Sequence, residues 1–103
     1  MLEQCFKELE MKYGEDFCWF KVSTQNNHFE SEAYHEIPPS HPLFGIKLTP
    51  LAKSEANDDV LFCTEQGQLI VIHLTYSKNN PAGFPKYKIL DSYHELKEYL
   101  EQQ

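Results

Sequence analysis

The first helical pattern lies at the beginning of the chain. Apolar positions recur there at steps of three and four residues: Leu2, Cys5, Phe6, Leu9 and Tyr13. This spacing places them on one face of an α-helix. Glu8 and Lys12 have the i,i+4 spacing of an ion pair along another side of the same helix. We therefore predict an amphipathic helix over residues 2–13.

Several segments combine aromatic or β-branched residues without a helical period, which is typical of β-strands. The expected strands cover residues 17–23, 45–53, 60–64, 68–76 and 87–90. Pro50 cannot donate a hydrogen bond to a neighbouring strand. The strand that contains Pro50 should therefore lie at a sheet edge or contain a break.

The third and fourth of these strands form the clearest unit, because only Glu65-Gln66-Gly67 separates them. A three-residue hairpin loop with glycine at its left-handed position is a common connection. This loop pairs Thr64 with Gln68, and the same register sets Asp59 opposite His73. Apolar residues alternate onto both faces of the hairpin, so we expect a sheet that is covered on both sides.

Residues 25–42 show the least regular pattern in the chain. They contain Pro38, Pro39 and Pro42 together with several histidine, asparagine and serine residues. Because proline disfavours helix and central strand, we expect a long loop that serves as a working surface or is poorly ordered.

A second helix is expected at the end of the sequence. Ser92 and Glu95 have the spacing of a capping box, in which a hydroxyl and a carboxylate satisfy unpaired amides at a helix start. Tyr93, Leu96 and Leu100 supply an apolar stripe, so the helix covers residues 92–101. The element order predicts one α+β domain over residues 1–103, with an antiparallel meander sheet of four to five strands.

The net charge of the chain favours some classes of binding partner over others. Sixteen acidic residues oppose nine lysines, there is no arginine, and the formal net charge is −7. Nucleic-acid binding is disfavoured, because it depends on neutralising phosphates. A basic protein partner suits this charge, although charge of this size also simply keeps a small domain in solution.

The sequence contains no pattern typical of a membrane span or a secretory leader. The longest strictly apolar runs have four residues, whereas a membrane helix needs about 20. Acidic residues mix into the beginning of the chain, where a leader would be basic and then apolar. Three widely spaced cysteines, Cys5, Cys18 and Cys63, suit reduced thiols, and we expect Cys18 and Cys63 in the core. We expect a cytoplasmic protein.

The hairpin register defines one candidate for chemistry. Asp59 opposite His73 can orient the imidazole, and Thr75 and then Ser77 follow on the same strand face. An acid, a base and a hydroxyl resemble the parts of a hydrolytic site. The alternative is that Asp59 simply satisfies a histidine where the sheet meets a loop, which is the interpretation that we favour.

A second candidate for chemistry is a metal site in the irregular segment. It would draw on three histidines and three glutamates: His28, His35, His41, Glu30, Glu32 and Glu36. Their spacing matches no zinc signature, so we expect no metal. The four glycines are far apart, which argues against a phosphate-binding loop, and we expect no cofactor.

Four segments of the chain resemble a small family of uncharacterised proteins from low-GC Gram-positive bacteria. They are His41-Pro42-Leu43-Phe44-Gly45, residues 52–62 (AKSEANDDVLF), His73-Leu74-Thr75-Tyr76-Ser77 and Gly83-Phe84-Pro85. The resemblance covers about residues 41–100 and implies a bacterial, cytoplasmic domain without an assigned activity. Small acidic α+β proteins of such bacteria are often immunity proteins, which bind other proteins.

Together these observations favour a non-catalytic domain that binds a basic protein or a small ligand. The expected binding residues lie near the 25–42 segment and the open end of the hairpin: His41, Asn57, Asp58, Asp59, His73, Thr75, Tyr76 and Ser77. The alternative function is a small hydrolase or transferase that uses Asp59 and His73, with Thr75 or Ser77 as the hydroxyl.

Overall fold

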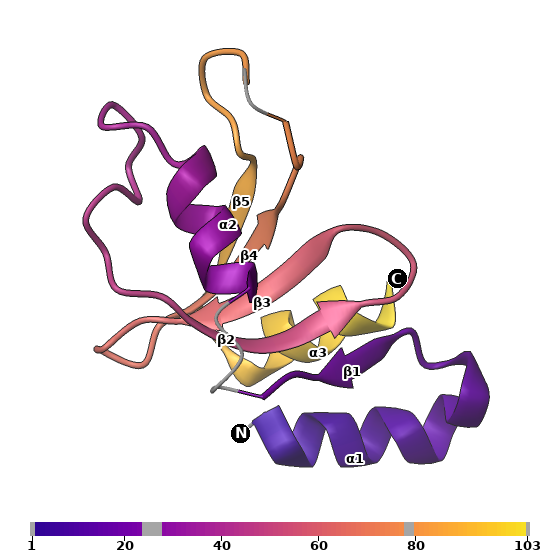
Figure 1. Cartoon of the computed structure of the whole chain (residues 1–103). Coiled ribbons are helices and arrows are strands. Elements are labelled where there is room, and N and C mark those ends of the chain that lie inside the picture. Colours follow the sequence, from indigo (N-terminus) through magenta and orange to yellow (C-terminus); the bar gives the residue numbers. More distant parts are fainter. Residues whose placement is uncertain (1, 24–27, 78–79, 103) are drawn as a thin grey trace.

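A computed structural model describes residues 2–23, 28–77 and 80–102 (Figure 1). Its helices are α1 (Leu2–Tyr13), the short 3-10 helix η1 (Gly14–Asp16), α2 (His28–Glu36) and α3 (Tyr93–Glu101). Its strands are β1 (Trp19–Lys21), β2 (Thr49–Ser54), β3 (Asp59–Cys63), β4 (Leu69–His73) and β5 (Tyr87–Leu90).

The five strands form one sheet in the order β1-β2-β3-β4-β5, and every neighbouring pair is antiparallel. The expected α+β fold with a meander sheet is therefore confirmed. The hairpin register is confirmed as well, since Asp59 lies opposite His73. The loop closes with a hydrogen bond of 2.9 Å from Thr64 N to Gln68 O, and Gly67 has a φ of +82°. A left-handed φ of this size favours glycine.

The sheet separates two hydrophobic cores, as the apolar residues on both hairpin faces predicted. On one face, Leu61 and Val71 pack with α1 and α3. On the other face, Phe62 and Ile70 pack beneath α2 and the segment that follows it. Figure 1 shows α2 and α3 on opposite sides of the sheet. Full burial of a side chain of this size stabilises the fold by about 1.5–3 kcal/mol.

The expectation of a long loop over residues 25–42 is wrong for half of its length. Residues 28–36 form α2, and Pro38 and Pro39 follow its end rather than interrupt it. Phe29, Ala33 and Ile37 are four residues apart and turn toward the core, which is the helical signal that the prolines obscured. Residues 25–27 lie outside the described part of the chain.

Several strands are shorter than the pattern predicted. β2 begins at Thr49 rather than residue 45, and its register shifts between Pro50 and Ala52. Pro50 therefore marks a break in an interior strand, one of the two predicted outcomes. β4 ends at His73 rather than residue 76, and Tyr76 has a left-handed φ of +54°. Such a φ in a residue other than glycine departs from strand geometry.

The two terminal helices have nearly the expected bounds and pair with each other by charge. Lys12 contacts Glu101 at 2.8 Å and Lys97 contacts Glu8 at 3.1 Å. The predicted Glu8–Lys12 pair along α1 is thus replaced by pairs between α1 and α3.

The helix cap at the start of α3 is present. Ser92 Oγ accepts a hydrogen bond of 3.1 Å from Glu95 N, while Glu95 Oε2 accepts one from Asp91 N. Within the described ranges, the helices are too short or too polar to cross a membrane.

Candidate functional site

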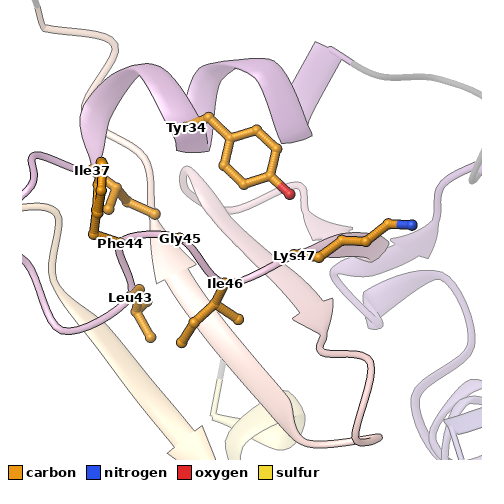
Figure 2. Close-up of a pocket in the computed structure, with 7 residues that line it drawn as sticks. All are labelled: Tyr34, Ile37, Leu43, Phe44, Gly45, Ile46 and Lys47. Carbon is orange, nitrogen blue, oxygen red and sulfur yellow. The ribbon is translucent and has the colours of Figure 1, made fainter.

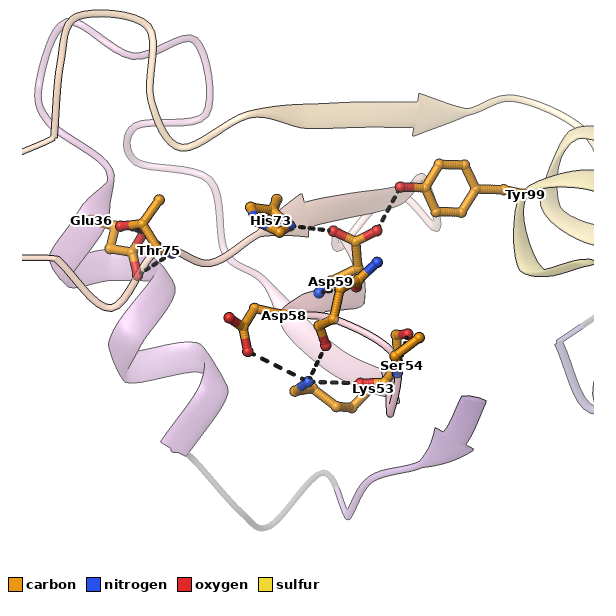
Figure 3. Close-up of polar contacts among 10 residues, drawn as sticks. Glu36, Lys53, Ser54, Asp58, Asp59, His73, Thr75 and Tyr99 are labelled. Carbon is orange, nitrogen blue, oxygen red and sulfur yellow. Dashed lines mark hydrogen bonds and ion pairs between the residues drawn. The ribbon is translucent and has the colours of Figure 1, made fainter. Parts of the chain in front are cut away.

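The predicted contact between Asp59 and His73 is present at the open end of the β3–β4 hairpin (Figure 3). His73 Nδ1 lies 2.8 Å from Asp59 Oδ1, and the hydroxyl of Tyr99 on α3 donates to Asp59 Oδ2 at 2.7 Å. Asp59 is only 5% exposed, whereas the His73 side chain is 49% exposed. A buried carboxylate therefore orients an accessible imidazole, and Tyr99 is a third member that the sequence did not indicate.

These three residues border a small pocket of about 170 Å³. Lys86, Tyr87 and Lys88 complete its wall from the neighbouring strand β5 and the residue before it. Burial, and then the hydrogen bond to Asp59, raise the pKa of Tyr99 well above its usual value. The phenol therefore stays protonated at neutral pH and keeps donating to Asp59.

Thr75 and Ser77 do not line this pocket, contrary to the expectation that they continue the face of His73. Thr75 Oγ1 lies 2.9 Å from Glu36 Oε1 and also contacts Asn80. Ser77 N donates to Thr75 Oγ1 at 3.2 Å. The chain leaves the strand after His73, and the Thr75 hydroxyl meets Glu36 of α2, so neither Thr75 nor Ser77 joins Asp59 and His73 at this pocket.

Glu36 is the centre of this second polar cluster. Its buried carboxylate accepts hydrogen bonds from Thr75 N at 2.8 Å and Tyr76 N at 2.9 Å. Burial acts to raise the pKa of Glu36, but hydrogen bonds from Glu32, Thr75 and Tyr76 outweigh it and hold that pKa below its usual value. The sequence indicated Glu36 only as a possible metal ligand, whereas in the structure it anchors α2 to the residues that follow β4.

Glu32 shares this carboxylate cluster one helical turn before Glu36. Its hydrogen bond to Glu36, together with burial, raises the pKa of Glu32 to about 7. Two neighbouring carboxyl groups that share a proton behave in this way, because the second charge is disfavoured.

Asn57 and Asp58 belong to the turn between β2 and β3. Asn57 Oδ1 accepts from Asp59 N at 2.8 Å, which is the contact of an Asx turn. Lys53 Nζ donates to Asn57 O at 2.6 Å and lies 3.9 Å from Asp58 Oδ1. Both residues therefore shape the loop that presents Asp59.

His41 is a buried structural residue and not part of an accessible binding surface. Its Nδ1 accepts from Leu43 N at 3.1 Å, and its Nε2 lies 2.9 Å from Pro85 O. An acceptor at Nδ1 and a donor at Nε2 define the neutral Nε2–H form. His41 thereby joins the segment after α2 to the segment before β5.

The remaining candidates do not assemble into a reactive site in the structure. Among residues 2–23, 28–77 and 80–102, no three histidine, cysteine, aspartate or glutamate side chains lie close enough together to hold a metal ion. The three cysteines are free thiols, and burial raises the pKa of Cys5 to about 11. Cys18 and Cys63 are only partly buried, less than expected.

An apolar groove of about 390 Å³ lies between α2 and the segment leading to β2 (Figure 2). Its lining is Tyr34, Ile37, Leu43, Phe44, Gly45, Ile46 and Lys47. Phe44 is 55% exposed and Tyr34 is 43% exposed. Tyr34 accepts a hydrogen bond of 2.8 Å from Leu48 N, so its ring is fixed at the groove. The sequence did not indicate this surface, because α2 was not predicted.

Comparisons with protein-family models, curated proteins and solved structures produce no match to this chain.

Proposed function

We propose that this chain is a non-catalytic binding domain whose groove between α2 and residues 43–47 binds a basic protein. The observation that supports this proposal best is the pair of exposed aromatic rings, Tyr34 and Phe44, beside a ready-made apolar groove. Exposed aromatic residues at apolar hollows are typical centres of protein interfaces. An apolar side chain of the partner would enter between them.

The charge around the groove supports a basic partner. α2 contains no lysine, and Glu30 is its glutamate outside the Glu32–Glu36 cluster. Burial raises the pKa of Tyr34, and the charges of Glu30 and Glu65 add to that effect, which places both carboxylates near the ring. With a net charge of −7, the chain attracts a basic surface before contact. Lys47 is a single positive charge at the rim.

The resemblance to a family from low-GC Gram-positive bacteria suggests what kind of basic protein the partner is. Under it, the protein is a bacterial cytoplasmic domain of the immunity type, and the apolar groove of this acidic chain binds and neutralises a basic toxin domain. This extension depends on the groove proposal, and a toxin gene next to the gene for this chain would support it.

The proposal is tested by combining a groove variant with salt dependence. The wild-type protein is immobilised and used to capture proteins from an extract of the cells that carry its gene. Each captured protein is then purified and titrated against wild type, Phe44→Ser and the control Phe20→Ser. Phe20 is a suitable control because it is 41% exposed but lies on β1, outside the groove.

We expect a basic partner whose affinity falls about tenfold or more with Phe44→Ser and is unchanged with Phe20→Ser. Its affinity should also fall steeply between about 0.05 and 0.3 M salt, because salt screens exposed charges. The proposal would be refuted by an acidic partner, by an affinity that does not change with salt concentration, or by equal affinity for Phe44→Ser and wild type.

A small hydrolase or transferase is the second candidate, and the 2.8 Å contact between Asp59 and His73 favours it. An imidazole oriented by a carboxylate can act as a general base. His73→Gln separates the two functions: an enzyme loses turnover with folding unchanged, whereas a groove-binding protein keeps its affinity for the partner.

A further inference from the structure

Positive charge gathers at one pocket of this acidic protein. Lys86 and Lys88 are two positions apart on an extended segment, so their side chains leave it on the same side. His73 is the strand neighbour, since His73 N donates to Lys86 O at 2.9 Å and Val71 lies opposite Lys88. All three side chains line the 170 Å³ pocket beside Asp59.

The two ammonium groups contact aromatic rings and not carboxylates. Lys88 Nζ lies 5.7 Å from the centre of the Tyr99 ring, and Lys86 Nζ lies 4.9 Å from the centre of the Phe84 ring. In the described part of the chain, neither lysine has a carboxylate within ion-pair distance. Their charges therefore remain available to a bound anion.

Asp59 sets one negative charge at the base of the pocket against the charges of the two lysines. Its two oxygens face His73 and Tyr99, and its side chain is almost completely buried.

We propose that the pocket formed by His73, Lys86, Lys88, Asp59 and Tyr99 binds a phosphoryl group, either free phosphate or a small phosphate monoester. Lysine is a common point-charge ligand of phosphate, and a volume of about 170 Å³ suits a small anionic group better than a drug-sized ligand. This site lies outside the apolar groove and does not depend on the proposed protein partner.

The test is an NMR titration of the ¹⁵N-labelled full chain with sodium phosphate, compared with sodium chloride at equal ionic strength. We expect saturable shifts of the amides of His73 and residues 86–88 with phosphate only. A Lys86→Gln/Lys88→Gln double variant should weaken binding about tenfold or more, and the control Lys7→Gln, at an exposed position of α1, should leave it unchanged. All three substitutions are on the surface, and a thermal melt of each variant verifies folding.

Methyl phosphate, titrated in parallel, separates the two sources of the ligand. Equal or tighter binding of methyl phosphate identifies an ester site, and binding of inorganic phosphate alone identifies a site for the free ion. Three results would overturn the proposal: the same shifts with chloride, equal weakening by Lys7→Gln, or no saturable shift at His73 and residues 86–88.

Discussion

Asp59 and His73 lie directly opposite each other on β3 and β4, and their side chains meet at 2.8 Å. A slip of one residue in this register would move each side chain to the other face of the sheet. The contact therefore depends on the three-residue loop that closes at Gly67. A buried carboxylate, an exposed imidazole and the Tyr99 hydroxyl follow from that alignment.

Asp59→Asn should lower the pKa of Tyr99. Burial and the hydrogen bond to the Asp59 carboxylate hold that pKa above its usual value, and the variant removes the second cause only. The pKa should therefore fall but stay above the ordinary value of about 10. Tyrosine ¹³Cζ shifts followed against pH measure it. Asp58→Asn removes the same charge one residue away and should leave Tyr99 unchanged, whereas an unmoved pKa in Asp59→Asn would show that the contact is absent.

Glu36→Ala should lower the free energy of unfolding by about 3 kcal/mol, because the amides of Thr75 and Tyr76 lose a charged acceptor. Urea unfolding measures the change. Glu10→Ala, at an exposed position of α1, is the control and should stay within about 0.5 kcal/mol of wild type. Equal stability of the two variants would mean that Glu36 does not anchor α2.

Glu32→Gln should change the pH dependence of stability. The pKa of Glu32 is raised to about 7 in the folded chain, against 4.5 as its ordinary value. The folded state therefore binds more protons than the unfolded state between these values, and stability falls as pH rises from about 4.5 to about 7.

The amide of Glu32→Gln cannot ionise, so this variant should lose that slope and be more stable than wild type at pH 8. Because Glu32 is partly exposed, the gain is about 1 kcal/mol or less. Thermal melts across this pH range measure it. Glu30→Gln, on the same helix, should keep the wild-type slope, and a Glu32→Gln variant with that slope would argue against the shared proton.

His41→Ala should cost about 2–4 kcal/mol of unfolding free energy. The substitution opens a cavity and leaves Leu43 N and Pro85 O without their partner. His94→Ala is the matched control, since the His94 side chain is 87% exposed, and it should change stability by about 0.5 kcal/mol at most. Denaturant unfolding of both variants is the measurement, and similar values for the two would place His41 at the surface.

The sequence predicted the parts of the fold that local rules decide. Helical spacing predicted α1, and the capping serine Ser92 predicted the start of α3. The hairpin loop with Gly67 predicted the register that places Asp59 opposite His73. It failed where distant residues decide the outcome. Thr75 turned away from His73 because Glu36, 39 residues earlier in the chain, accepts its hydrogen bonds. Spacing along the chain carries no signal of such a contact.

The groove and Tyr99 were missed for related reasons. α2 is short, and only three apolar residues, Phe29, Ala33 and Ile37, mark its buried side. Two prolines follow them directly, so the composition of the segment predicted a loop and the helical spacing was overlooked. The helical spacing of Tyr99 predicts only that its ring packs against the sheet. Its hydroxyl reaches Asp59 because α3 passes the first residue of β3. The groove and the Tyr99–Asp59 contact both arise from the packing of separate elements, which the pattern of a single segment does not predict.

The sheet covered on both faces sets how two ligands would influence each other. The groove beneath α2 and the pocket beside α3 are back to back, with β4 contributing Ile70 to one face and Val71 to the other. Simultaneous occupancy therefore involves no steric competition. β4 nevertheless connects the two sites, because Glu36 of α2 holds the residues that directly follow His73.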